Sequence, residues 1–238
     1  MDYNDSIRAV KGVGEKAEQR FAKLQIREVG DLLEHYPRDY DEFHDTVPIR
    51  TLEEGKRMAI EGVLRRKPTV RNTSRIKIIT ALFEDETGTV QVTWFNMPFL
   101  ASRLHMGTRY LLRGRVGRVN GKLVLEQPKM YSKNEFYKNV GKMLPIYPLT
   151  AGLTNVQVTK AVKQALSECE GIAEFLPPEI RKRHDLIGYR KAVQDIHFPK
   201  NRIEFYRARR RLVFDELFLY QAALRAIRVR NDRESSHV

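Results

Sequence analysis

The sequence predicts an α+β protein in which a small five-stranded β-barrel lies between two helical segments. Three observations predict this fold class. Residues 56–131 alternate apolar and polar side chains as strands do. The stretches on both sides repeat their apolar residues at helical spacing. Apolar residues form 42% of the 238, which is enough for a packed core. We expect a helical hairpin-like segment in 1–50, the barrel in 51–133, a linker with short helices in 134–200 and a long helix in 201–238.

The first segment is typical of short helices joined by a glycine turn. Gly12 and Gly14 precede a stretch whose apolar residues recur at helical spacing. Glycine adopts backbone angles that other residues avoid, and backbone N–H groups at a helix start can hold a phosphate. The sequence leaves two interpretations open, a phosphate-binding turn and an ordinary packing unit. Residues 37–48 follow as a polar, acidic connector without periodicity.

The barrel is predicted from five strands within 56–131. Asn120 and Gly121 form the dipeptide that most strongly favours a two-residue hairpin turn. A short helical segment at 98–105 lies between the third and fourth strands, and this is the element order of an OB-fold. The interior glycines Gly62 and Gly114 suit the bends that a small barrel needs.

The C-terminal part is predicted to be helical after a second connector at 132–153. Thr154 and Gln157 form a capping box at the start of a helix, and short helices follow at Pro177–Pro178 and at 189–197. The last helix is expected from about Arg202 to Arg230. One stripe of apolar residues runs along it at helical spacing: Val213, Leu217, Tyr220, Leu224 and Ile227.

Composition narrows the classes of function. The net charge of +13 attracts polyanions, with nucleic acid as the first candidate and an anionic membrane surface as the second. No apolar run approaches the ~20 residues of a membrane span, and the single cysteine excludes a disulfide framework and fits a cytosolic protein. None of the three Gly-Lys pairs is followed by Ser or Thr, so the sequence has no Walker-type phosphate loop. We therefore expect a binding protein with no catalytic residue, metal or cofactor of its own.

Basic residues are concentrated between Lys56 and Lys77, where eight basic residues accompany one acidic residue. The loop between the first two strands of an OB-fold commonly contacts oligonucleotides, and cations there bind phosphates without regard to sequence. The alternative is a solvated charged surface, and the clustering on one loop favours binding. The residues predicted to bind the DNA backbone are Arg65, Arg66, Lys67, Arg71, Arg75 and Lys77.

Three aromatic residues, Trp94, Phe95 and Phe99, lie at the predicted end of the third strand and the start of the short helix. Strand alternation places Trp94 and Phe95 on opposite faces, so one enters the core and the other points outward. An exposed aromatic pair beside a basic groove would stack on bases, at roughly 1–3 kcal/mol per base. The alternative is that all three rings belong to the core, which composition alone favours.

Six stretches in one order carry a resemblance over nearly the whole chain. The stretches are Lys11–Gly14, Gly30–Tyr40, Trp94–Leu100, Pro145–Leu153, Leu186–Pro199 and Ala208–Gln221. Through them the sequence resembles the N-terminal region of the RecG family of bacterial ATP-dependent DNA helicases, which remodel stalled forks.

The resemblance implies that the barrel is a wedge at the branch point of forked DNA. Phe95 would stack on the terminal base of one arm and Phe99, commonly Tyr in the family, would cap the other. The basic segment would hold single-stranded or template DNA. The implied partners are branched DNA, single-stranded DNA and the helicase motor domains of the same parent protein, which would use ATP and Mg. The setting would be recombination and repair at the bacterial nucleoid, in the cytoplasm.

The motor would follow the last helix, so we expect a fragment of a longer protein in preference to a truncated paralogue. In a protein without the motor, the apolar stripe on that helix would be exposed to solvent and would favour aggregation. Two other hypotheses about function stay open at this point: a single-strand-binding OB module without branch preference, and a structural adaptor.

Overall fold

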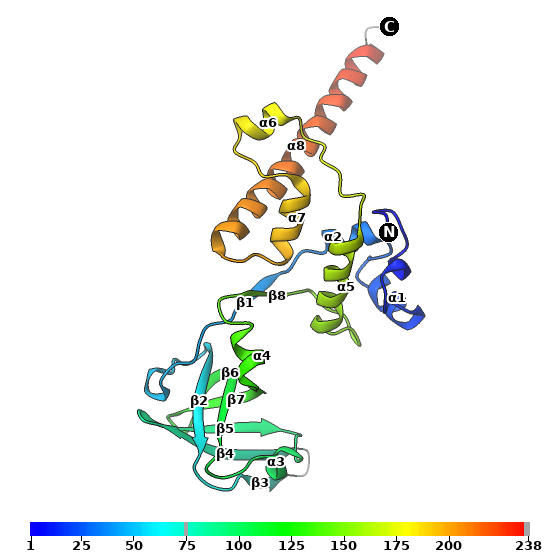
Figure 1. The fold of residues 1–238 in the computed structure, drawn as a ribbon. Helices are drawn as coiled ribbons and strands as arrows, with labels where there is room; N and C mark the ends of the chain where they lie inside the picture. The colour runs from blue at the N-terminus through cyan, green and yellow to red at the C-terminus, as the bar shows by residue number, and fades with distance from the viewer. Residues whose placement is uncertain (74–75, 236–238) are drawn as a thin grey trace. The chain divides into compact units, whose positions relative to one another are not determined.

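The computed structural model describes residues 1–73 and 76–235, and it separates into two compact units (Figure 1). Residues 43–141 form one unit, called here the barrel unit, and residues 1–42 together with those from 142 onward form the helical unit. The sequence placed the boundaries at 50, 133 and 200. The structure differs because the first segment and residues 147–193 contribute to one apolar core, which includes Phe21, Leu33, Tyr147 and Val162.

The barrel unit contains a six-stranded sheet. Its strands are β2 (Arg57–Leu64), β3 (Thr69–Asn72), β4 (Lys77–Asp85), β5 (Gly88–Phe95), β6 (Arg109–Val119) and β7 (Lys122–Tyr131). The strand order is β2-β6-β7-β5-β4-β3, and β2 also pairs with β4. Five strands therefore close into a ring, with β5 and β7 parallel and the other pairs antiparallel. This confirms the predicted five-stranded barrel, and α3 (Leu100–Arg103) lies between β5 and β6 as expected.

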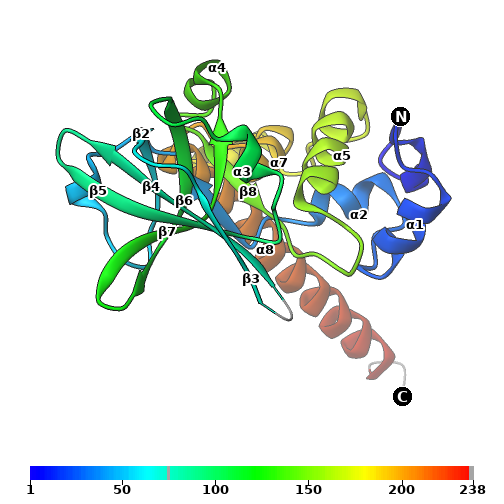
Figure 2. The ribbon, with the colours of Figure 1, turned by 90° about the horizontal axis from the view of Figure 1, so that it is seen from below.

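The sixth strand, β3, was not predicted. Among the described residues it pairs with β4 alone and stands at the end of the strand order, beside β4 (Figure 1 and Figure 2). All four of its residues are exposed, so it shows no apolar alternation, and its pairing depends on the hairpin that it forms with β4. The basic segment predicted as a loop therefore contains a strand.

The barrel core and turns follow the sequence closely. Ile60, Phe83, Trp94 and Leu112 are almost completely buried, as strand alternation predicts. The turn between β6 and β7 places Asn120 at φ 49° and the glycine after it at 76°, the left-handed angles that a type I′ turn needs. The unit also contains η2 (Ile49–Thr51) and α4 (Lys133–Tyr137).

The helical unit begins with η1 (Ile7–Ala9), α1 (Glu15–Ala22) and α2 (Val29–Glu34), and continues after the barrel with α5 (Asn155–Glu168), α6 (Pro178–Arg183), α7 (Tyr189–His197) and α8 (Arg202–Ser235). The capping box of Thr154 and Gln157 is present at the start of α5, and α7 has the predicted bounds. The two predicted connectors are corrected: β1 (Asp39–Glu42) and β8 (Met143–Ile146) pair antiparallel, because residues about a hundred apart satisfy each other's backbone groups.

The long helix α8 has two different halves. Its first half packs against α7, with Ala208 buried against Ala192 and Ile196. Arg211 and Asp215 are buried on the same half and pair with each other at 2.8 Å. The second half extends beyond α7 (Figure 1), and its side chains are largely exposed as far as residue 228. Within the described residues, none of the helices combines the length and the apolar character that crossing a membrane requires.

Candidate nucleic-acid interface

The aromatic run divides between the core and the surface of the barrel unit. Trp94 is 1% exposed and donates its indole N–H to the Pro128 carbonyl oxygen at 2.8 Å, whereas Phe95 is 37% and Phe99 49% exposed. The prediction that Trp94 and Phe95 point to opposite faces is confirmed. The alternative that all three rings belong to the core is wrong, and two phenyl rings meet solvent at the end of β5.

One cation shares the outer face of the sheet with Phe95. In the register of the sheet, Arg71 on β3 lies opposite Ile78 on β4, and Ile78 lies opposite Phe95 on β5. Residues directly opposite in antiparallel strands project to the same side. The row Arg71–Ile78–Phe95 therefore presents a guanidinium, an apolar side chain and a phenyl ring on one surface.

A second cation belongs to the other ring. The Arg103 guanidinium carbon lies 5.4 Å from the centre of the Phe99 ring, a cation–π contact between residues four apart. Sequence reasoning missed Arg103, although its spacing from Phe99 on a short helix was a usable signal. Ile76 and Met97 are exposed apolar residues that flank the paired positions Lys77 and Asn96.

The predicted backbone-binding cations have different environments. Arg65 forms a hydrogen-bonded ion pair with Glu84, so its charge is partly neutralised. Arg66 and Lys67 are exposed between β2 and β3, and Lys77 is exposed at the start of β4. In the described part of the chain, no carboxylate pairs with Arg66, Lys67, Arg71 or Lys77. Arg75 lies outside the described residues.

The glycine turn belongs to the other unit. Gly12 has φ 95°, which a residue with a side chain rarely adopts, but Gly14 is extended at φ −88° and any residue could take its place on backbone grounds. Gly14 is the N-cap residue of α1. The structure therefore does not bring Gly12 and Gly14 together with the barrel residues in one compact unit.

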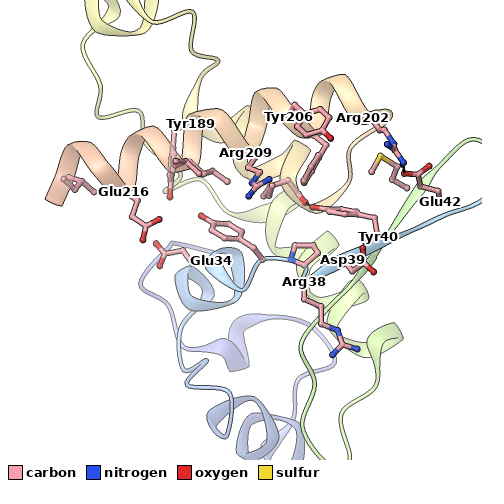
Figure 3. A pocket seen from close by; sticks show the side chains of 18 residues that line it. Glu34, Arg38, Asp39, Tyr40, Glu42, Tyr189, Arg202, Tyr206, Arg209 and Glu216 are labelled. Atoms are coloured by element: carbon pink, nitrogen blue, oxygen red, sulfur yellow. Dashed lines mark hydrogen bonds and ion pairs between the residues drawn. The ribbon is translucent and has the colours of Figure 1, made fainter. Parts of the chain in front are cut away.

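The helical unit contains a cleft of about 1010 Å³ between α8 and residues 34–42 (Figure 3). Four carboxylates line it, those of Glu34, Asp39, Glu42 and Glu216. Figure 3 shows Glu34 and Glu216 pointing toward one another at one end. Burial raises the pKa of Tyr36 at this end, and the charges of both glutamates add to the rise. Arg38, Arg202 and Arg209 line the same cleft, and Arg202 pairs with Glu42 at 2.8 Å, so acidic and basic side chains are mixed there. Among the described residues no cluster of His, Cys, Asp or Glu suits a metal ion.

The closed five-stranded ring with a helix between its third and fourth strands places this chain among proteins that carry an OB-fold barrel with flanking helices. Comparison with known families then names the group. The model of the RecG wedge domain matches residues 6–169, and the chain belongs to the RecG wedge domain family.

Individual relatives agree with this assignment. The chain is 30% identical to the ATP-dependent DNA helicase RecG of Thermotoga maritima, over 98% of this chain and 30% of that protein. It is 28% identical to the RecG of Streptococcus pneumoniae, over 99% of this chain and 34% of that protein. A solved structure of RecG bound to a three-way DNA junction matches with a TM-score of 0.78 and 28% identity, over 98% of this chain and 32% of that one. The resemblance seen in the sequence is confirmed, and the chain spans about a third of the length of these relatives.

Proposed function

We propose that this chain is the DNA-binding wedge of a RecG-type ATP-dependent helicase and that it binds branched DNA, including stalled forks and Holliday junctions. The observation that carries the proposal is the exposure of Phe95 and Phe99 beside cations on one end of a barrel of the RecG wedge family. The match to a RecG structure bound to a three-way junction supports the same substrate class.

The exposed rings supply the preference for a branch. Inside a linear duplex each base face is covered by its neighbours, so a protein ring has no face to stack on. Where strands part, the terminal bases expose their faces, and each stacked base contributes roughly 1–3 kcal/mol. Phe95 and Phe99 come from consecutive elements, the end of β5 and the start of α3, and can serve two arms of one branch.

The cations supply affinity that does not depend on sequence. Arg71 shares the outer face of Phe95, while Arg66, Lys67 and Lys77 lie on the segments around β3. Contacts from such residues to phosphates release counterions, so binding weakens steeply as salt rises. We include Arg75 on the sequence pattern, and we assign Arg65 a smaller part because Glu84 already pairs with it. The single-stranded portion of a fork is the partner that this surface fits.

We further propose that the motor domains of the parent protein pack on α8 and bring ATP and Mg to the assembly. Val213, Leu217, Tyr220 and Ile227 are exposed at helical spacing, on the side opposite the buried Ala208. A helix with a second apolar face usually buries it against a partner. The whole protein would act in recombination and repair at the nucleoid, in the bacterial cytoplasm.

A competition assay tests the wedge function. Fluorescence anisotropy would compare a three-way junction, a linear duplex and a single strand, using the wild-type chain and Phe95→Ala/Phe99→Ala. We expect the wild type to prefer the junction, and the double variant to lose about tenfold or more for the junction, the size of one lost stack or more, with little change for the duplex. Met106→Ala, which truncates another exposed apolar side chain of the barrel unit, is the matched control.

Two outcomes would contradict the proposal. Equal wild-type affinity for junction and duplex would remove the branch preference. Binding of the single strand as tightly as the junction, with the same loss in the double variant, would instead indicate an OB module for single strands.

A further inference from the structure

The strand that carries Phe95 ends in a backbone turn held by two side chains. Asn96 has φ 57°, a left-handed angle that asparagine tolerates better than most residues. Its backbone N–H donates to the Lys77 carbonyl oxygen at 2.7 Å, and its side-chain Oδ1 accepts the Lys77 backbone N–H at 3.1 Å. Because the chain turns at Asn96, the side-chain oxygen replaces the backbone carbonyl that a continuing strand would have offered to Lys77.

A second side chain acts on the other edge of β5. The parallel pairing of β5 with β7 ends at Thr93 and Glu126. The Phe95 backbone N–H lies beyond this last pair and donates to Oε1 of Gln127 at 3.3 Å. Gln127 belongs to a β-bulge opposite Gly114 and has φ 45°. The bulge turns the Gln127 side chain toward Phe95, so an amide oxygen extends this ladder as well.

We propose that Asn96 and Gln127 are positioning residues, which hold Phe95 and Lys77 in the arrangement that receives a branch. Asn96 bonds to β4 on one side of the strand end and Gln127 bonds to Phe95 from β7 on the other, and each supplies a hydrogen-bond acceptor that the backbone lacks there. This inference rests on the proposed function, since it assigns a purpose to the ring that Phe95 presents.

The location of the backbone strain supports this assignment. In the described part of the chain, five residues other than glycine have positive φ: Gln25, Asn96, Asn120, Gln127 and Asp185. Asn120 is explained by its hairpin turn, whereas Asn96 and Gln127 both hydrogen-bond at the Phe95 end of β5. Strained backbone of this kind persists where the surroundings over-determine it, and it gathers at functional sites. A ring whose backbone is fixed on both edges loses little conformational freedom when it stacks on a base.

The test uses Asn96→Gly and Gln127→Gly, because glycine keeps the left-handed backbone and removes only the side-chain acceptor. Asn120→Gly makes the same replacement at a positive φ in the β6–β7 turn and is the matched control. The first readout is amide hydrogen exchange without DNA. We expect the Lys77 N–H to lose protection in Asn96→Gly and to keep it in Asn96→Asp, and the Phe95 N–H to lose protection in Gln127→Gly.

The second readout is the ratio of junction affinity to duplex affinity. We expect each glycine variant at the two positions to lower this ratio about three- to tenfold, the size of one hydrogen bond, and Asn120→Gly to leave it unchanged. Full retention of the ratio in both variants, while Phe95→Ala lowers it, would overturn the positioning role and leave the wedge function standing. Retention of the ratio in Phe95→Ala itself would count against the proposed function instead.

Discussion

Acidification should destabilise the helical unit through one buried histidine. His197 is fully buried; its Nε2–H donates to the Leu33 carbonyl oxygen at 2.9 Å, and Nδ1 accepts the Tyr147 hydroxyl at 2.9 Å. The carbonyl can only accept, so the neutral ring carries its hydrogen on Nε2. Burial lowers the pKa of His197 from the ordinary 6.5 to about 4, and the nearby His35 adds to the fall.

The sign and size of the effect follow from proton linkage. The unfolded chain binds a proton at His197 near pH 6.5 and the folded chain only near pH 4, so the stabilisation is complete above 6.5 and is lost as pH falls toward 4. Each tenfold difference in proton affinity is worth about 1.4 kcal/mol, which gives roughly 3 kcal/mol in full, of which about 2 kcal/mol falls between about pH 7 and pH 4.5.

Two measurements check this prediction. In urea unfolding followed by the helical circular dichroism signal, the free energy of unfolding should fall by about 2 kcal/mol over this pH range. The pH dependence of this free energy should be weaker in His197→Gln. NMR titration of the His197 ring should give a pKa near 4 in the folded chain. Titration near 6.5 in the folded chain would refute the reasoning even if the glutamine variant did not fold.

Three further predictions test other contacts. Arg211→Met should cost roughly 3 kcal/mol in urea unfolding, because its buried guanidinium pairs with two carboxylates that the change would leave without a partner; a cost near zero would contradict this. Arg71→Ala should lower the slope of log affinity against log salt by about 0.7–0.9, whereas Arg65→Ala should change it less because of the Glu84 ion pair; equal slopes for both variants would refute the distinction. Gly114→Ala should destabilise the barrel by about 1–3 kcal/mol, since an added Cβ would lie 2.8 Å from a backbone oxygen of β7; an unchanged melting temperature would show that the bulge can yield.

Features that depend on neighbours in sequence were predictable. Alternation over β5 predicted that Trp94 and Phe95 lie on opposite faces, because successive side chains of a strand project to opposite sides. The structure shows that Trp94 is the buried one. The Asn120 turn and the capping box at Thr154 followed from the chemistry of a few adjacent residues. The basic segment and the aromatic run were recognisable from their clustered residue types. Most residues of the proposed interface could therefore be predicted from the sequence.

The stretches that carry the family resemblance could be recognised in the sequence, but their structural role could not. Three of them, around Leu33, Tyr147 and His197, meet in one hydrogen-bonded network in the helical unit. No spacing rule predicts that a carbonyl, a phenol and an imidazole from such distant positions will share one site. Their contact depends on how α2, α7 and the residues after β8 pack.

The remaining features depend on pairing between segments that are distant in sequence. Alternation of apolar and polar residues could not reveal β3, whose residues are all exposed. No local pattern indicated that β1 and β8 would pair, because the barrel residues separate them in the sequence. The register of β3 places Arg71 in line with Phe95, and a shift of one residue would turn Arg71 to the other face. Local chemistry indicated the exposed cations and aromatic rings, whereas long-range backbone hydrogen bonding decides which of these side chains share one face of the sheet.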